Sequence, residues 1–196
     1  IRAIKLQPQN PFTWSSGWKS PIYCDNRVSL SFPEIRNFIK ESLAAVVKEN
    51  FSSAEMIAGV ATAGIAHAAL IADELAMPMC YVRSSPKSHG MGNLIEGQVL
   101  PKQKVVVVED LISTGGSSLN VVNALRDAGF EVLGMVAIFT YGFNSADEKF
   151  KAANCKYFTL TNYFQLIDEA LNQKIISAEE MAALKKWREQ PETWGR

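Results

Sequence analysis

Short apolar runs alternate with amphipathic segments along most of this chain. The runs are rich in aliphatic and β-branched residues and show no polar alternation, which is typical of strands that a parallel sheet buries on both faces. On this basis we predict strands over 56–60, 79–83, 105–109, 132–140 and 156–160.

Around these runs, apolar residues recur every three or four positions, which is the period of an amphipathic helix. We predict helices from about 31 to 48, over 63–75 and 117–128, from about 146, and over 163–171 and 177–188. Ser31 and Glu34 have the spacing of a capping box, as do Ser177 and Glu180, so each pair is expected to begin a helix. Gly129 is a common C-terminal stop.

Strands that alternate with helices predict the fold class. They indicate an α/β protein with a largely parallel, doubly wound sheet flanked by helices. The chain has 196 residues, of which 47% are hydrophobic and 20% charged, a composition that suits one globular domain. Because no repeat, low-complexity tract or linker interrupts it, we expect a single domain over 1–196.

Charge and cysteine content narrow the class of protein. Twenty basic and twenty acidic residues give a formal net charge of zero, so we expect no nucleic-acid partner and only a local anion site. The three cysteines are far apart, which favours reduced thiols in a cytoplasmic protein. We expect no membrane association, because no apolar run is long enough to span a bilayer. The chain lacks both a signal-like start and an initiator Met, so we expect that a few preceding residues, such as a short helix, are missing.

The segment 105–118, VVVVEDLISTGGSS, carries the most specific chemistry. Ligands of open parallel sheets bind at the carboxyl ends of the strands, where Glu109 and Asp110 are placed. The hydroxyl- and glycine-rich loop that follows, with the next helix N-terminus, suits a phosphate. The two acids would repel that phosphate but could accept hydrogen bonds from neighbouring ribose hydroxyls. An ordinary capped turn is the alternative, but it gives no reason to bury two carboxylates.

This pattern differs from other phosphate motifs and resembles one family. No lysine follows Gly116 as a P-loop requires, and the dinucleotide fingerprint is absent. The segment resembles the phosphoribosyl-diphosphate (PRPP) motif of type I phosphoribosyltransferases. The resemblance implies that Asp110 is catalytic. It also implies that PRPP contacts Glu109, Asp110, Leu111, Ile112, Ser113, Thr114, Gly115, Gly116 and Ser117.

Two glycine-containing loops add to this resemblance. The loop 59–64, GVATAG, looks like the family's diphosphate-binding loop, although such turns are mostly structural. Residues 84–97 are too long for a tight connection, as binding loops are. Within YVRSSPKSHG (81–90) the match is to the catalytic flexible loop of orotate phosphoribosyltransferases, which implies that Arg83, Lys87 and His89 bind PRPP and that Lys87 and His89 are catalytic. In that family the loop reaches the neighbouring subunit, which implies a homodimer.

The N-terminal residues 1–30, here called the hood, narrow the choice of base. Residues 12–27, FTWSSGWKSPIYCDNR, could be a surface loop and an edge strand, but they are similar to the orotate-specific hood of that family. The resemblance implies that Ser113 contacts both PRPP and orotate. Some members have lysines where this chain has Ser15 and Ser84. Many also place an arginine after the strand 132–140, where this chain has none. The orotate carboxylate is then expected to meet Lys19, Arg27 or amides of 15–17.

Together the resemblances imply an orotate phosphoribosyltransferase. Such an enzyme transfers ribose 5-phosphate from PRPP to orotate, giving orotidine 5'-phosphate and diphosphate. Mg²⁺ is implied as cofactor, held mainly by the diphosphate and ribose hydroxyls, with no protein metal ligand expected. Two alternatives remain: transfer to another base, and a non-catalytic regulator that senses PRPP. Lys87 and His89, together with the neutral charge, favour an enzyme.

Overall fold

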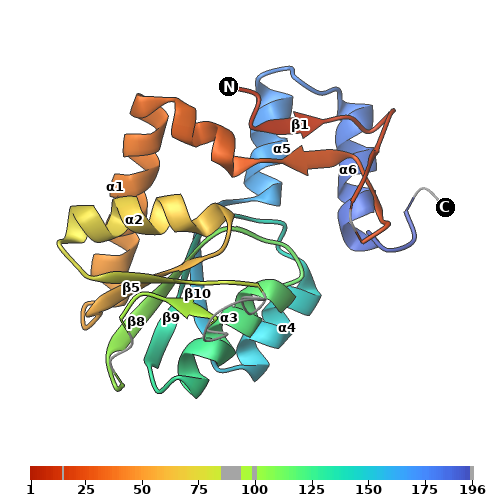
Figure 1. The fold of residues 1–196 in the computed structure, drawn as a ribbon. Helices are drawn as coiled ribbons and strands as arrows, with labels where there is room; N and C mark the ends of the chain where they lie inside the picture. Colours follow the sequence, from red (N-terminus) through yellow and green to blue (C-terminus); the bar gives the residue numbers. More distant parts are fainter. Residues whose placement is uncertain (15, 85–93, 99–100, 195–196) are drawn as a thin grey trace.

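A six-stranded sheet forms the centre of the computed structural model, which describes residues 1–14, 16–84, 94–98 and 101–194 (Figure 1). Neighbouring strands are parallel except β7, which is antiparallel to β6. In sheet order the strands are β10 (Lys156–Asn162), β9 (Glu131–Thr140), β8 (Lys104–Ile112), β5 (Met56–Val60), β6 (Met79–Val82) and β7 (Ile95–Glu96). The predicted α/β class with a largely parallel sheet is confirmed.

Helices cover both faces of this sheet. One face carries α1 (Pro33–Asn50) and α2 (Ala63–Leu75), and the other carries α3 (Gly116–Asp127) and α4 (Asn144–Ala152). The four consecutive valines of β8 divide between these layers. Val106 and Val108 belong to the core under α1 and α2, whereas Val105 and Val107 belong to the core under α3 and α4. A strand buried on both faces therefore needs apolar residues at successive positions.

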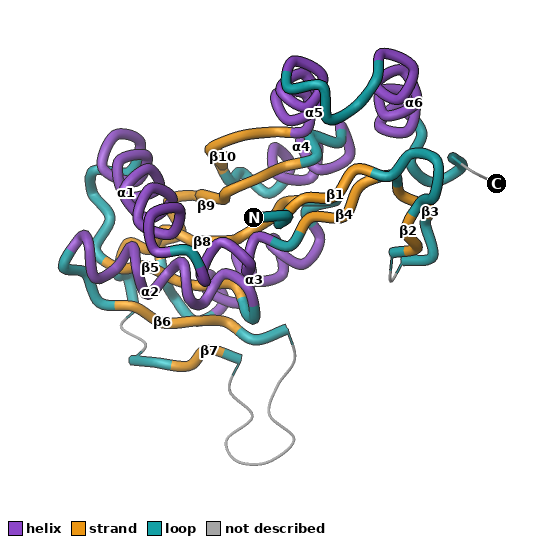
Figure 2. The backbone as a smooth tube through the Cα atoms, turned by 90° about the horizontal axis from the view of Figure 1, so that it is seen from above, coloured by secondary structure: helices purple, strands orange, loops and turns teal. Residues whose placement is uncertain are grey.

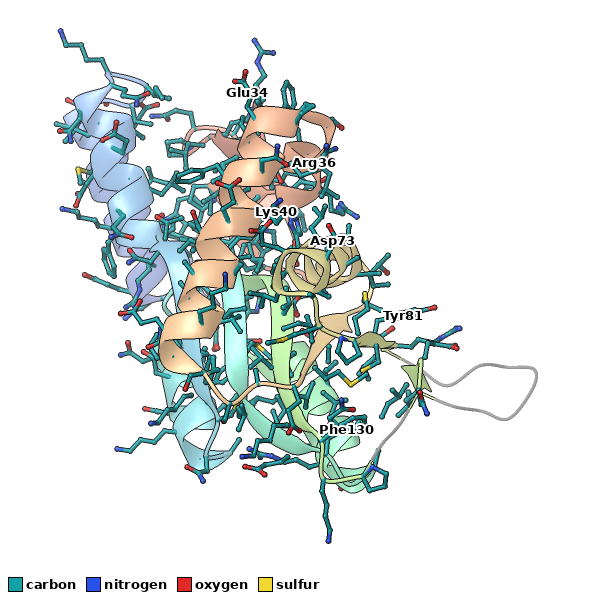
Figure 3. All side chains as sticks on the ribbon, turned by 90° about the vertical axis from the view of Figure 1, so that its left-hand side faces the viewer. Glu34, Arg36, Lys40, Asp73, Tyr81 and Phe130 are labelled. Carbon is teal, nitrogen blue, oxygen red and sulfur yellow. The ribbon has the colours of Figure 1, made fainter. Side chains whose placement is uncertain are left out.

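The helices α1 and α2 pack side by side on their face of the sheet (Figure 3). An ion pair joins them on the outside, because Lys40 Nζ lies 2.7 Å from Glu74 Oε2. Below it, the buried side chains of Leu43 and Ile71 belong to one core cluster. Among the helices of the described ranges, none has the length and apolar character needed to cross a membrane.

The hood consists of two small antiparallel strand pairs. β1 (Ile4–Leu6) pairs with β4 (Ile22–Cys24), and β2 (Phe12–Thr13) with β3 (Lys19–Ser20), before the 3-10 helix η1 (Asn26–Ser31). The C-terminal helices α5 (Tyr163–Asn172) and α6 (Ala178–Glu189) lie beside these strands (Figures 1 and 2). Trp187 is fully buried there and donates a hydrogen bond of 3.0 Å to the Lys19 carbonyl. A third core cluster, which contains Ile22, Tyr163 and Trp187, thus joins the hood to α5 and α6.

The structure confirms one predicted capping box and corrects the other. At α6, the Ser177 hydroxyl accepts a hydrogen bond from the Glu180 amide, and the Glu180 carboxylate accepts one from the Ser177 amide. At α1, however, Ser31 still belongs to η1, Phe32 occupies the N-cap without a side-chain bond, and Pro33 is the first helical residue. Proline fits that position because its missing N–H would have no helical partner there.

Several strand boundaries differ from the prediction by one to three residues, and one short strand was not predicted. β8 continues to Ile112, three residues beyond the predicted end at Glu109, because β9 pairs with it that far. The short strand β7 lies inside 84–97, which the sequence indicated as loop throughout; its residues pair with the edge strand β6.

Helix α2 approaches β8 closely at Gly64. A Cβ atom added to Gly64 would lie 2.5 Å from the Val108 carbonyl oxygen. We therefore expect Gly64→Ala to lower the free energy of unfolding in urea by about 1–3 kcal/mol, because helix and strand must separate. Gly116→Ala is the matched control: its Cβ would meet no atom within 4 Å, and alanine favours helix by up to about 1 kcal/mol. An equal loss in both variants would contradict this close approach.

Candidate active site

The two predicted acids lie where β8 extends beyond one of its neighbours. β5 pairs with β8 only as far as Val108, whereas β9 pairs with it to Ile112. Within the part of the chain that the structure describes, residues 109–112, here called the β8 overhang, therefore have a strand on one edge only. The carboxyl ends of β5, β6, β8 and β9 share this edge of the sheet, where ligands of open parallel sheets bind.

Glu109 and Asp110 are not equivalent in the structure. Glu109 is only 5% exposed, and Asp110 is half-buried. The Glu109 carboxylate accepts hydrogen bonds from the Asp110 amide at 3.0 Å and from the Ser118 hydroxyl at 3.2 Å. Burial, and then the neighbouring Asp110 carboxylate, raise the pKa of Glu109 well above its usual range. Asp110 is therefore the more accessible acid for a ligand hydroxyl.

Buried polar groups surround the other edge of the β8 overhang. Asn26 donates a hydrogen bond of 2.8 Å from Nδ2 to the Asp110 carbonyl, and its Oδ1 accepts one from the Cys24 thiol at 3.4 Å. Burial, and then the charges of Asp110 and Asp25, raise the pKa of Cys24 to about 12, so the thiol remains a donor. His67 of α2 is 2% exposed, and its Nε2 has no hydrogen-bond partner among the described residues. Burial lowers the pKa of His67, which Asp110 partly opposes.

The loop after the β8 overhang suits a ligand group that carries several hydrogen-bond acceptors. Gly115 has a φ of 77°, in the left-handed region that glycine tolerates, and a Cβ there would lie 3.0 Å from the Phe150 ring. The N-cap residue Gly115 has no side chain that could cap α3, so the first amides of this helix can donate to an anion at its positive end. Lys149 of α4 adds a cation behind the loop, since its Nζ donates to the Thr114 carbonyl at 3.2 Å.

A pocket of about 590 Å³ adjoins this loop. Its aromatic walls come from the hood and from the turn after β9, with the rings of Trp14 and Tyr141 centred 5.1 Å apart. Ser113 and Thr114 contribute hydroxyl groups from the loop between β8 and α3. The full lining is Thr13, Trp14, Ser16, Trp18, Tyr23, Cys24, Leu111, Ser113, Thr114 and Tyr141. A flat heterocycle with polar edges suits such walls.

The cations expected to meet a carboxylate in this pocket differ in their surroundings. Lys19 donates from Nζ to the Thr13 hydroxyl at 2.8 Å, and Thr13 lines the pocket. Arg27 is engaged by Asp25, to which its Nε and Nη2 donate at 2.6 and 2.9 Å. Both arise from the hood. Of the backbone amides expected as alternatives, that of residue 15 lies outside the described ranges.

An arginine that sequence reasoning did not select reaches the turn after β9. Arg188 of α6 donates to the Gly142 carbonyl and lies 3.4 Å from Asn144 Oδ1. It lines a second pocket of about 420 Å³, which shares Trp18 with the first. An arginine distant in sequence thus occupies a turn whose own residues contain none.

The other predicted PRPP contacts lie in different parts of the structure. Ser113 and Thr114 line the aromatic pocket with Leu111, whereas Ile112 is fully buried and can offer only backbone groups. Gly115, Gly116 and Ser117 form the turn into α3. Arg83 follows β6 at the same sheet edge, with Nη1 3.6 Å from Glu96 Oε1. Lys87 and His89 lie outside the described residues.

Two residues at this site, Asn26 and His67, were not singled out from the sequence. Asn26 of η1 bonds to the Asp110 carbonyl, and His67 of α2 lies within the electrostatic influence of Asp110, so only the fold brings them to the acids. Ser118 belongs to the recognised segment 105–118, but its bond to Glu109 forms only when α3 packs against β8. The many aromatic residues within 12–27 could have indicated a pocket for a base. Nothing in the sequence around Tyr141 indicated that this ring would join them. The three cysteines are free thiols, as expected. Within the described ranges, no three His, Cys, Asp or Glu residues gather as a metal site.

Comparisons with known proteins agree with this geometry. The model of the phosphoribosyl transferase domain family matches residues 32–174. The orotate phosphoribosyltransferase of Porphyromonas gingivalis is 60% identical over 195 residues, which cover 100% of this chain and 93% of that protein. Among solved structures, orotate phosphoribosyltransferase from Aeropyrum pernix superposes with a TM-score of 0.74 at 28% identity, covering 85% and 92%. Leishmania donovani UMP synthase gives 0.81 at 25% identity, covering 96% of this chain and 40% of that one.

Burial of Glu109 predicts a pH-dependent stability. The pKa of Glu109 in the folded protein lies above the ordinary 4.5, so the protonated carboxyl contributes its full stabilisation below pH 4.5. This stabilisation is lost as the pH rises through the pKa of the folded state. Glu109→Gln should therefore have a higher free energy of unfolding in urea than the parent at pH 8, because glutamine brings no ionisable group into the buried position. At pH 4.5 the gain should shrink.

The exposed Glu148 on α4 supplies the control for this measurement. Glu148→Gln removes a carboxylate of the same type and should leave the pH dependence of unfolding as in the parent. A Glu109→Gln variant whose unfolding follows the parent at both pH values would show that the buried carboxyl carries no such penalty.

Proposed function

This chain belongs to the orotate phosphoribosyltransferase family, and on that premise we propose that it transfers ribose 5-phosphate from PRPP to orotate. The products are orotidine 5'-phosphate and diphosphate, so the enzyme serves pyrimidine nucleotide synthesis. With three free cysteines, the proposed site of this reaction is the reducing cytoplasm.

The observation that carries the proposal is the junction of two subsites. The half-buried Asp110 lies near the end of β8, and the start of α3 follows it across the short loop 113–115. The aromatic pocket adjoins that loop through Ser113 and Thr114. A ribose with a 5'-phosphate spans the first two groups, and a base attached to the ribose reaches the third.

Each part of the donor has a proposed partner. Asp110 accepts hydrogen bonds from the ribose hydroxyls, with Glu109 beside it, and residues 113–117 donate to the 5'-phosphate. The diphosphate lies toward the loop 59–64, near Arg83. As the bond to the anomeric carbon breaks, positive charge develops on the ribose. The Asp110 carboxylate favours that charge, so it stabilises the transition state more than the bound substrate.

For the base, we propose orotate in the aromatic pocket with Ser113 beside it. Lys19 is the cation we favour for its carboxylate. Its ammonium group contacts Thr13 on the pocket wall, whereas Asp25 already engages two nitrogens of Arg27. The absence of a strong general base from this proposal follows from orotate itself, which is already acidic.

Mg²⁺ fits the oxygen-rich chemistry of this site as part of the substrate complex. Asp110 offers a hard oxygen donor, but a protein cage is not built from the described residues alone. We propose that the ion is held mainly by the diphosphate and ribose hydroxyls. When bound, it neutralises charge on the departing diphosphate. The protein's own contribution is to orient the ribose and to donate to the phosphates.

Lys87 and His89 complete the proposal, in a segment outside the described residues. We propose that this loop closes over the diphosphate in the active site of a partner subunit. Their positive charge would stabilise the leaving group and limit hydrolysis of PRPP. A homodimer is then the smallest active unit.

A base-consumption assay tests the proposed activity. With PRPP and Mg²⁺, the protein should consume orotate and leave adenine, guanine and hypoxanthine unchanged, followed by base absorbance. In the same assay, Lys19→Met should raise the KM for orotate about tenfold or more while the KM for PRPP changes little, because a lost charge-assisted hydrogen bond costs about 1.5–3 kcal/mol. Consumption of a purine instead of orotate would replace the proposed substrate, and binding of PRPP without turnover would indicate a regulator.

Mixed dimers test the shared loop. Lys87→Ala should lower kcat far more than it weakens PRPP binding, because the contact strengthens as the leaving group gains charge. Mixed and reassociated with Asp110→Asn subunits, it should recover about a quarter of parental activity at equal amounts, since half of the dimers then carry one intact site. If no mixing ratio restores activity beyond the sum of the two variants, each subunit uses its own loop.

A further inference from the structure

One buried side chain of the hood bonds directly to the acid-bearing strand. Asn26 is 6% exposed, and its Nδ2 donates 2.8 Å to the backbone oxygen of Asp110, 84 positions away. This contact joins η1 to β8, although the sheet strands β5, β6 and β7 lie between them in the sequence. The bond is therefore made only when the hood is docked on the folded sheet.

The bond falls where the β8 overhang lacks a strand neighbour. β5 pairs with β8 only to Val108, so a carbonyl beyond that point needs another partner when it is buried. On the opposite edge, β9 pairs with the overhang through Leu111 and Ile112. With Asn26 in place, the backbone at Asp110 is held from both edges.

Asn26 is itself fixed by its neighbours. Its Oδ1 accepts a hydrogen bond from the Cys24 thiol at 3.4 Å, and its backbone oxygen accepts one from the Ser29 hydroxyl at 2.6 Å. Cys24 also lines the aromatic pocket. A continuous set of bonds thus runs from the wall of the proposed base pocket, through Asn26, to the backbone of the acid proposed to bind ribose.

We propose that Asn26 is a positioning residue, which directs the Asp110 carboxylate toward the ribose and ties that acid to the base pocket. The inference rests on the proposed function. A side chain leaves a strand in a direction set by its backbone, so a backbone that shifts at Asp110 moves the carboxylate with it. Misplacement of a reacting group by about 1 Å can cost about 100-fold in rate.

A double-mutant cycle with Asp110 tests this role. Asn26→Ala removes the donor, and Asp110→Asn removes the carboxylate charge while keeping the backbone carbonyl that Asn26 bonds. In the parent, Asn26→Ala should lower kcat/KM for PRPP by about 10-fold to 100-fold. In the Asp110→Asn background the same change should cost less than about threefold, because there is no carboxylate left to position.

The double variant can turn over too slowly for kcat/KM to be measured. In that case the PRPP dissociation constants of the parent, the two single variants and the double variant, measured by calorimetry, give the same cycle. Equal losses in both backgrounds would overturn the proposal, since Asn26 would then act on the fold in general. So would a parental kcat/KM unchanged by Asn26→Ala. If Asn26→Ala does not fold, Asn26→Leu keeps a similar volume but loses the donor without adding a charge beside Asp110, and the same two outcomes decide.

Ser20→Ala is the matched control. Ser20 is buried in the hood, where its hydroxyl donates to the Ile22 carbonyl, and it bonds neither to Asn26 nor to Asp110. It should lower the midpoint of thermal unfolding while kcat/KM stays within about twofold of the parent. The orotate activity of the parent is measured first, so that failure of the proposed function is distinguished from failure of the role of Asn26.

Discussion

The β8 overhang is the constraint on which the rest of the site depends. Past Val108, β8 has a strand on one edge only. This leaves room for α2 and η1 to approach its other edge, and it places Glu109 and Asp110 at the rim of the sheet while their backbone stays ordered. Valines that face both layers anchor the preceding half of the strand. Four apolar residues in a row thus serve to hold two acids at a fixed point.

Burying acids there is unfavourable because a buried carboxylate loses its hydration, and the two acids are buried to different extents. Glu109 takes most of the burial and is supported by the Ser118 hydroxyl and the Asp110 amide. Asp110 remains half-buried and accessible. Two adjacent carboxylates in one site repel each other, so one of them is driven toward the protonated form. The more exposed acid is the one that a ligand can reach, and the buried one is held by Ser118 and the Asp110 amide.

The sequence predicted most of the fold because its signals were local. Apolar runs predicted the strands, and the helical period predicted both ends of α2 to the exact residue, because these signals do not depend on distant partners. Errors arose where a neighbour decided the outcome. β9 extends β8 to Ile112, and β6 turns Ile95 and Glu96 into a strand. Pro33 and η1 displaced the expected capping box at Ser31. At the site, contiguous motifs identified the acids and the loop, but Asn26, His67, Tyr141 and Arg188 reach it through tertiary packing and left no pattern to find.

The most direct test of the account is a crystal structure of the protein with PRPP bound. We predict that the ribose hydroxyls lie within hydrogen-bond distance of the Asp110 carboxylate and that the 5'-phosphate accepts bonds from the amides of 114–117. The pyrophosphoryl end should point toward the loop 59–64. A donor bound elsewhere, or a ribose that faces away from Asp110 with its phosphate outside this loop, would contradict the account.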